Sequence, residues 1–261
     1  MTDHNLLPIQ PDVYDKDYYL HNRGGSAEFR ESRGRELYYG HEYSLKLAEL
    51  KTTDTVLDVG CGCGEIVFHA AQQAARVDAF DYATDAIQLA NEAKDTYDSA
   101  IRSKIYFHVS DVESFDWAKE KYDVVFFVDV IEHLTQNQID ATLRRIYESL
   151  KPGGRLVVHT WPNRWHRQYT YPVIHAIRKV LGRKTQRDPR TEHEKLMHIS
   201  EQSPLELRSN LRRAGFSGRV FLNHFEPAKG SLAQGFHWFM HSIPPFKWGF
   251  CDDIFAVAVK S

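Results

Sequence analysis

A run of ten residues, Val56–Glu65, constrains this chain more than any other part of it. Apolar residues typical of a buried strand lead directly into three alternating glycines, Gly60, Gly62 and Gly64, and a helix-forming segment begins near Ile66. Glycine permits a positive φ in a tight turn from strand to helix, and its missing side chain lets a ligand lie against the backbone. The sequence therefore predicts a loop that holds a cofactor against its main chain.

Strands and helices alternate around this loop. Nearly continuous apolar strands separated by amphipathic helices are the pattern of a parallel sheet covered on both faces. The predicted strands are 55–59, 76–80, 105–109, 122–128, 155–160, 218–223 and 253–259, and the predicted helices are 66–73, 84–94, 136–150 and 204–214. We therefore predict a doubly wound α/β domain that binds its ligands at the carboxyl ends of the strands.

The remaining segments suggest how the chain is organised. Residues 1–50 are predicted to form a loose N-terminal arm followed by a helical cap, and residues 51–261 to form a Rossmann-like main domain. Two insertions, 161–200 and 225–250, interrupt the later half of that domain. The tyrosines between Tyr14 and Tyr19 are either packing anchors of the cap or part of a lid over the cofactor.

The charge and hydropathy of the whole chain disfavour several classes of protein. A formal net charge of −2 without a basic tail does not indicate general nucleic-acid binding, although a local basic patch is compatible with it. The apolar runs are too short to span a bilayer and the N-terminus has no signal-peptide pattern, so we expect a soluble, cytoplasmic protein without membrane insertion. Three cysteines cannot all pair, which fits a reducing compartment. No pattern indicates an oligomeric state.

The spacing of the glycines separates two classes of cofactor. Dinucleotide-binding folds use Gly-x-Gly-x-x-Gly, in which the third glycine lets the helix pack closely on the strand. Here the order is Gly60-x-Gly62-x-Gly64, and Glu65 stands where that third glycine would be. The spacing therefore disfavours a nicotinamide or flavin cofactor.

The segment from Asp58 to Gly64 resembles motif I of the class I S-adenosylmethionine-dependent methyltransferases. Further matches to that family follow in its order at Asp81-Tyr82, Asp111-Val112, 128–134 and 150–154. The resemblance implies a seven-stranded, mostly parallel sheet with S-adenosylmethionine as the cofactor.

The same resemblance implies roles for individual residues. Asp81 would bind the ribose hydroxyls, Tyr82 would pack on the adenine ring, and Asp111 and Val112 would contact the adenine amino group and ring. The cofactor-binding residues predicted in this way are Asp58, Gly60, Cys61, Gly62, Gly64, Asp81, Tyr82, Asp111, Val112 and Val128, and the lid interpretation adds Tyr19.

Methyl transfer from a sulfonium is a direct displacement, so the protein mainly aligns the reactants and excludes water. A hydroxyl acceptor also needs a base, and His133 is predicted to serve because it follows the fourth strand and histidine is poised near neutral pH. Glu132 is the second predicted catalytic residue, and either could take a proton if an alkene carbon were methylated instead. Alternatively, His133 caps the following helix or fixes a cofactor loop.

A divalent metal such as Mg²⁺ is a second possibility, although no metal is the primary prediction. Asp129, Glu132 and His133 are close in sequence, and His193 or His198 could complete an oxygen and nitrogen site. The segment resembles the magnesium sites of the terminal small-RNA and ubiquinone-pathway O-methyltransferases, except that Asp129 stands where those carry Glu.

The two insertions are predicted to form the acceptor pocket. Residues 161–200 hold nine basic and three acidic residues, a net charge of +6. Arginine suits phosphate or carboxylate, and aromatic rings offer an apolar wall. A solvated basic face and aromatic core packing are the alternatives. The predicted substrate-binding residues are Tyr14, Trp161, Arg164, Trp165, His166, Tyr169, His198 and Trp238.

These features predict a methyltransferase whose small-molecule acceptor has an anionic group and an apolar or ring-shaped body. A sugar or glycolipid, a natural product and a prenyl diphosphate intermediate all fit that description. Two alternatives stay open. The basic insertion and the partial metal motif are compatible with a metal-assisted RNA 2′-O-methyltransferase, and the cofactor motifs alone are compatible with a non-catalytic regulator that binds S-adenosylmethionine.

Overall fold

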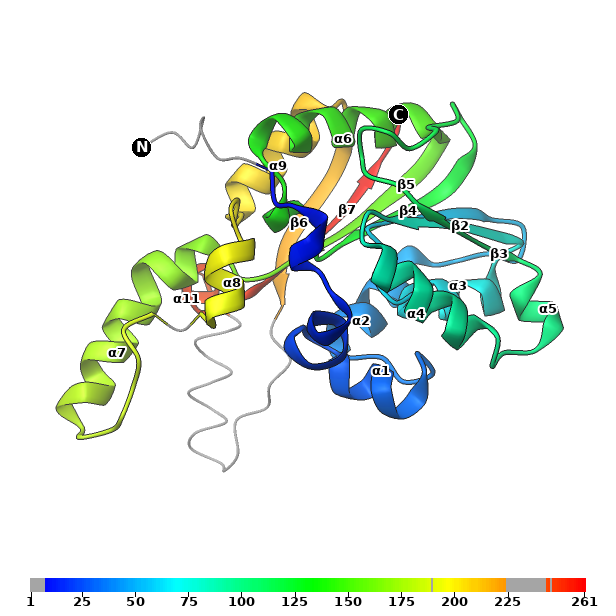
Figure 1. Ribbon diagram of the computed structural model, residues 1–261. Helices are drawn as coiled ribbons and strands as arrows, with labels where there is room; N and C mark the ends of the chain where they lie inside the picture. Colours follow the sequence, from blue (N-terminus) through cyan, green and yellow to red (C-terminus); the bar gives the residue numbers. More distant parts are fainter. Residues whose placement is uncertain (1–7, 189, 224–242, 245) are drawn as a thin grey trace.

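A single seven-stranded sheet forms the centre of the computed structural model, which describes residues 8–188, 190–223, 243–244 and 246–261 (Figure 1). The strand order is β3-β2-β1-β4-β5-β7-β6, and β7 runs antiparallel to β5 and β6 whereas the other neighbours are parallel. The strands are β1 (Thr55–Val59), β2 (Arg76–Asp81), β3 (Ile105–Val109), β4 (Tyr122–Val128), β5 (Leu150–Thr160), β6 (Ser217–Asn223) and β7 (Asp253–Val259). The predicted doubly wound, mostly parallel sheet is confirmed.

Helices cover both faces of this sheet (Figure 1). They are α1 (Ser26–Ser32), α2 (Tyr39–Ala48), α3 (Glu65–Gln73), α4 (Thr84–Lys94), α5 (Ser99–Arg102), α6 (Gln136–Ser149), α7 (Tyr171–Val180), α8 (Glu192–Met197), α9 (Pro204–Arg213) and α11 (Phe246–Phe250). Single helical turns lie at Pro11–Val13, Tyr18–Asn22, Ile131–His133 and His166–Thr170. None of the described helices is both long and apolar enough to cross a membrane.

The core consists of two layers, one on each face of the sheet. Successive side chains of a strand point to opposite faces, and β4 supplies Val124 and Phe126 to one layer and Val125 and Phe127 to the other. Helices α2, α3 and α4 pack on the first layer, and α6 and α9 pack on the second. Because both faces are covered, the central strands are apolar along their whole length.

Strand β5 begins five residues earlier than the predicted strand 155–160. Strand β5 begins at Leu150, which pairs with Tyr122, whereas the next paired residues are Val124 and Arg155. The residues between bulge out of the ladder, and Gly153 has a φ of +75°. A Cβ at Gly154 would lie 2.8 Å from the carbonyl oxygen of Lys151, so the bulge requires glycine there.

The N-terminal segment packs over the face of the sheet that carries α3 and α4. Tyr14, Tyr19, Phe29 and Ala48 are all buried in the core layer of that face. The segment therefore lies beside the glycine loop, and the division of the chain at residue 50 stays a prediction. The first insertion contains α7 and α8, and most of the second, 225–242 and 245, lies outside the described residues.

Candidate active site

A cavity of about 790 Å³ opens at the carboxyl ends of β1, β2, β4 and β5. Its walls come from the glycine loop, from the segments after β2, β3 and β4, from the N-terminal cap and from the first insertion. This is the edge at which a doubly wound sheet binds its ligands. The predicted site residues that line it are Tyr14, Tyr19, Gly60, Cys61, Gly62, Asp81, Tyr82, Asp111, Val112, Val128, Asp129, Glu132, His133, Trp161, His193 and His198.

The glycine loop presents its backbone to this cavity. Gly60 and Gly62 have φ values of +72° and +52°, which side chains rarely tolerate. A Cβ at Gly60 would lie 2.5 Å from Val130 Cγ2, whereas one at Gly62 would meet only the ring of Tyr19, at 3.6 Å. Gly60 therefore allows the loop to pack closely on Val130. The missing side chain of Gly62 leaves an open space beside the backbone of the loop, which we call the glycine cradle. Gly64 and Asp58 do not belong to the described cavity lining, and Gly64 instead packs on Phe107.

Asp81 ends β2 and faces the glycine loop. Its Oδ2 accepts a hydrogen bond of 2.9 Å from the backbone N–H of Gly62, and its Oδ1 accepts one of 2.9 Å from Ala83. Tyr19 Oη lies 3.5 Å from Oδ1. Burial raises the pKa of Asp81, and the hydrogen bonds that it accepts act in the opposite direction. Each carboxylate oxygen has more than one lone pair, so both can still accept hydroxyl groups of a ligand.

Asp111 and Val112 follow β3 at the same edge. Asp111 Oδ1 accepts hydrogen bonds from the backbone N–H groups of Glu113 and Ser114 and from the Ser114 hydroxyl. These bonds fix the turn, and the adjoining Val112 lines the cavity. The arrangement is compatible with the predicted contacts to an adenine ring, which stay a prediction.

An ion pair that sequence reasoning missed ties the cap to the glycine loop. Arg23 Nη2 lies 2.5 Å from Glu65 Oε1, and both side chains are nearly buried and line the cavity. Burial raises the pKa of Asp58 well above its usual value, and the nearby carboxylates of Glu65 and Asp81 raise it further. Arg23 thus brings a positive charge to a crowded group of carboxylates. No periodic pattern marks Arg23, which lies between two short helices of the cap.

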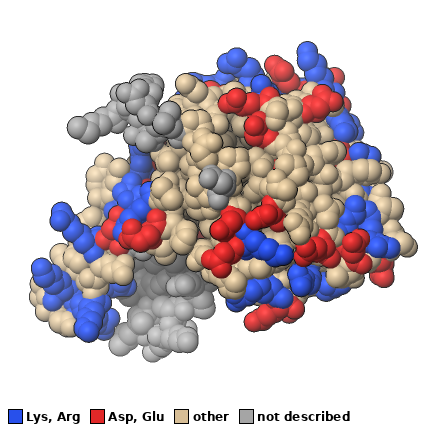
Figure 2. Space-filling model, viewed as in Figure 1, with Lys and Arg blue, Asp and Glu red and all other residues tan. Residues whose placement is uncertain are grey.

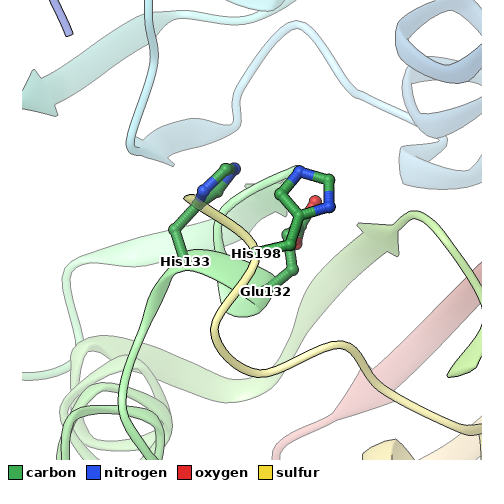
Figure 3. A group of neighbouring side chains, drawn as sticks. All are labelled: Glu132, His133 and His198. Atoms are coloured by element: carbon green, nitrogen blue, oxygen red, sulfur yellow. The ribbon is translucent and has the colours of Figure 1, made fainter. Parts of the chain in front are cut away.

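Glu132, His133 and His198 form a cluster in the wall of the cavity (Figure 3). Their nearest ligand atoms all lie within 4.8 Å of one another. Glu132 and His133 belong to the turn after β4, and His198 follows α8 in the first insertion. The fold therefore joins two segments that are 65 residues apart in sequence. His193 lines the cavity but is not a member of the cluster.

The hydrogen bonds of His133 determine its tautomer. Its Nδ1 lies 3.1 Å from the carbonyl oxygen of Met197 and 2.9 Å from Tyr14 Oη. A carbonyl oxygen only accepts, so Nδ1 carries the proton and Nε2 keeps a lone pair. Burial lowers the pKa of His133 to about 4, which leaves the ring neutral at pH 7. Burial, with His133 nearby, also lowers the pKa of His198 to about 3.

Glu132 is held differently. Its Oε2 accepts a hydrogen bond of 2.9 Å from Thr160 Oγ1, and the residue is 2% exposed. Burial and the neighbouring charge of Asp129 raise its pKa to about 8. A neutral imidazole and a carboxyl group of raised pKa thus stand side by side, which is an arrangement suited to proton transfer.

Asp129 belongs to a separate network at the floor of the cavity. It adopts a φ of +56°, accepts a hydrogen bond from Tyr38 and lies 2.6 Å from Nδ1 of His159. His159 Nε2 lies 3.0 Å from Asp253 Oδ1. Histidine in the apolar segment 155–160 and aspartate at the start of β7 were signals that could have pointed to this network.

Several predicted substrate-binding residues lie elsewhere. Arg164 forms an ion pair with Glu206, and His166 hydrogen-bonds to the backbone of Gly249. Neither belongs to the described lining of the cavity, nor do Trp165 and Tyr169. Trp238 lies outside the described residues.

Comparisons with known proteins agree with this fold and loop. Residues 56–154 match the family model of a methyltransferase domain. The chain is 31% identical over 140 residues to the ubiquinone biosynthesis O-methyltransferase of Rickettsia akari, covering 54% of this chain and 51% of that protein. It is 30% identical over 115 residues to phosphoethanolamine N-methyltransferase 3 of Arabidopsis thaliana, covering 44% and 22%. The chain thus spans about half or less of the length of these relatives.

Solved structures share the fold at low sequence identity. Phosphoethanolamine N-methyltransferase 2 of Haemonchus contortus superposes with a TM-score of 0.63 at 17% identity, over 97% of this chain and 60% of that one. A chain from the complex of the Haloferax volcanii Trm112 methyltransferase activator with a methyltransferase superposes with a TM-score of 0.62 at 15% identity, over 97% and 99%.

The sheet order and the glycine loop define a Rossmann-like domain of the methyltransferase type. Residues 56–154 are therefore a methyltransferase domain of the class I S-adenosylmethionine-dependent type.

Proposed function

We propose that this protein transfers a methyl group from S-adenosylmethionine to a small-molecule acceptor. The observation that carries the proposal is that the open glycine cradle and the Glu132–His133–His198 cluster line one cavity. When bound, S-adenosylmethionine supplies an electrophilic methyl carbon on a sulfonium. Gly60, Gly62 and Asp81 would hold it, because a side chain on the loop would fill the cradle and the carboxylate suits two adjacent hydroxyls.

His133 would act as the base toward the acceptor. Its Nδ1–H donates a hydrogen bond to the carbonyl oxygen of Met197. Nε2, which keeps a lone pair, is therefore the atom that can take a proton. Its lowered pKa keeps that lone pair available at neutral pH, although it also makes His133 a weaker base. Glu132, held by Thr160, would orient the acceptor.

The charges around the cavity support a neutral or cationic acceptor. Among the described residues that line it, nine are Asp or Glu, whereas the cations are Arg23 and the imidazolium of His159, which already contacts Asp129 and Asp253. Arg23 is already paired with Glu65, and Arg164, which motivated an anionic acceptor, is paired with Glu206. Binding an anion among carboxylates is electrostatically unfavourable. We therefore propose a hydroxyl or amine acceptor with a ring-shaped or apolar body, and we disfavour a prenyl diphosphate.

The names of the relatives agree with such an acceptor only in part. One is named an O-methyltransferase and the other an N-methyltransferase, so oxygen and nitrogen acceptors are both represented. The second name includes a phosphate group, which the described cavity lining does not favour here.

The experiment is release of S-adenosylhomocysteine with a panel of phenols, sugars and amines, each tested with and without a phosphate group. We expect turnover with at least one uncharged or cationic compound, and a lower kcat/KM for its phosphorylated counterpart. Binding of S-adenosylmethionine without turnover on any compound would favour the regulator instead. Turnover confined to phosphorylated compounds would contradict the proposed acceptor class, and turnover on RNA would favour the nucleic-acid alternative.

The Glu132–His133–His198 cluster could also hold a metal ion. One carboxylate and two imidazoles form a donor set richer in nitrogen than Mg²⁺ prefers, and Asp129 is engaged by Tyr38 and His159. The set therefore does not fit Mg²⁺ well, and we propose that methyl transfer here needs no added Mg²⁺.

A further inference from the structure

Helix α7, in the first insertion, turns an apolar face to solvent. Val173, Ile177 and Val180 are 57%, 54% and 87% exposed, and Leu181 just beyond the helix is 65% exposed. No residue of α7 is buried. Helices of globular proteins derive most of their stability from packing an apolar face, so an apolar helix without such packing needs another partner.

The exposed side chains form one stripe. Val173, Ala176, Ile177 and Val180 follow the spacing i, i+3, i+4 and i+7, which places them on one side of a helix. Tyr169, one turn before Val173, is 67% exposed. The helix is therefore amphipathic, but its apolar side faces away from the protein core.

Basic side chains flank this stripe. Arg178 and Lys179 follow Ile177 on opposite sides of the stripe, since each helical residue turns by about 100°. Arg183, Lys184 and Arg187 come directly after the helix, and there is no Asp or Glu from residue 165 to residue 187. Figure 2 shows basic side chains gathered at the end of the molecule where α7 projects in Figure 1.

These cations differ from the other basic residues of the insertion. Arg164, Arg167 and Arg190 form ion pairs with Glu206, with Glu201, and with Asp188 and Glu201. Within the described part of the chain, no such pair involves Arg178, Lys179, Arg183, Lys184 or Arg187. Five cations for which the described residues supply no carboxylate partner thus lie on or shortly after the helix that carries the apolar stripe.

We propose that α7 and the turn after it bind the surface of a membrane that contains anionic phospholipids. The helix would lie in the plane of the interface, with its apolar stripe among the acyl chains and its cations at the lipid phosphates. Long basic side chains can extend from such a stripe toward the headgroups. The helix is too short to span a bilayer, so the contact is peripheral.

The charge pattern favours this partner over two others. A second copy of the chain would place five cations against five more, which is unfavourable. A nucleic acid would attract the cations, but its charged backbone would not bury the exposed side chains of valine and isoleucine. An anionic lipid surface complements both features.

The test is co-sedimentation of the full chain with vesicles, and it needs no methyl transfer. One set of vesicles contains phosphatidylcholine alone, and the other equal parts of phosphatidylcholine and phosphatidylglycerol. We expect binding to the second set only, weakening as salt is added. Replacing Lys179 or Arg183 by Ala should each lower the partition coefficient about fivefold, which corresponds to ~1 kcal/mol per basic residue near an anionic surface.

The apolar stripe has a matched control. Ile177→Glu with Val180→Glu should abolish vesicle binding, whereas Leu205→Glu on α9, at a site 62% exposed, should leave it unchanged. The wild type and these two variants should bind S-adenosylmethionine equally and have the same circular dichroism spectrum. A loss of vesicle binding would then not be due to a loss of folding.

Three outcomes would overturn the proposal. The first is that the wild type binds neither set of vesicles. The second is that the doubly substituted protein binds anionic vesicles as well as the wild type does. The third is dimerisation in light scattering, or salt-dependent binding to RNA, without any binding to vesicles. Because none of these readouts depends on turnover, a failure here leaves the proposed methyl transfer untouched.

Discussion

The Nδ1 atom of His159 lies 2.6 Å from Oδ1 of Asp129 in the buried floor of the cavity, although the contact is not aligned as a hydrogen bond. The ring stacks on Phe255, and its other nitrogen lies 3.0 Å from Asp253. Burial alone would lower the pKa of His159, but the two carboxylates raise it to about 10. His159 is therefore an imidazolium at neutral pH, and it joins the ends of β4, β5 and β7.

This pKa predicts how stability depends on pH. A histidine whose pKa is raised on folding contributes stability that is fully present below its unfolded pKa of about 6.5 and is lost as the pH rises toward 10. We expect the free energy of unfolding, measured with urea, to contain a component that falls across this range. His159→Asn should remove that component and destabilise the protein by ~3–5 kcal/mol at pH 7, because the buried carboxylate of Asp253 and the part-buried carboxylate of Asp129 lose their cation. His21→Asn, at an exposed site, is the control, and an unchanged pH slope in His159→Asn would contradict this view.

Asp81 provides a test of cofactor binding. Asp81→Asn keeps the size of the side chain but removes the charge that would accept two ribose hydroxyls. We expect its affinity for S-adenosylmethionine to fall about 10- to 100-fold, since hydrogen bonds to a charged group contribute ~1.5–3 kcal/mol. Isothermal titration gives the measurement, and Asp95→Asn, on the exposed surface, should bind as the wild type does. Equal affinities of all three proteins would remove Asp81 from the cofactor site.

The two glycines of the loop should respond differently to alanine. Gly60→Ala places a Cβ 2.5 Å from Val130, so strain at positive φ and overpacking together should cost ~2–5 kcal/mol of stability. Gly62→Ala meets no such obstacle and should cost only ~1–2 kcal/mol for its backbone conformation. Gly62→Ala should nevertheless weaken S-adenosylmethionine binding, because its methyl group enters the cradle. Chemical unfolding and titration of both variants test this, and equal destabilisation would contradict the described packing.

His133 and His193 both line the cavity, but only His133 is expected to act as a base. His133→Gln should lower kcat about 100-fold or more, the contribution typical of general base catalysis, without changing the affinity for S-adenosylmethionine. His193→Gln, the matched control, should leave kcat nearly unchanged. If the two substitutions lower kcat equally, the role assigned to His133 is wrong.

Dialysis against EDTA tests whether methyl transfer requires a metal ion. We expect full activity after chelation and no gain from added Mg²⁺, because the cluster offers one carboxylate with two imidazoles. Activity that disappears with EDTA and returns with Zn²⁺ or Mn²⁺ would instead assign a metal to Glu132, His133 and His198. Mass spectrometry of the purified protein under native conditions would then identify the ion.

The sequence predicted the part of the cavity lining that follows the strands better than the part that comes from the first insertion. Gly60, Gly62 and Asp81 lie within a few residues of strand ends, so their places follow from the sheet order alone. The arginine at 164 was predicted from composition, and composition does not reveal that a carboxylate 42 residues later, Glu206, pairs with it. Likewise, nothing near Arg23 indicates its contact with Glu65.

By itself the sequence determined the doubly wound sheet and the glycine loop after its first strand, because strand periodicity and a glycine turn are local properties that act over ten residues or fewer. Only the tertiary structure decided which polar groups meet. In the structure, His198 lies beside Glu132 and His133, whereas Asp129 contacts His159. The apolar side of α7 faces solvent. Charge pairing and burial depend on distances between segments far apart in the chain, and local patterns carry no information about those distances.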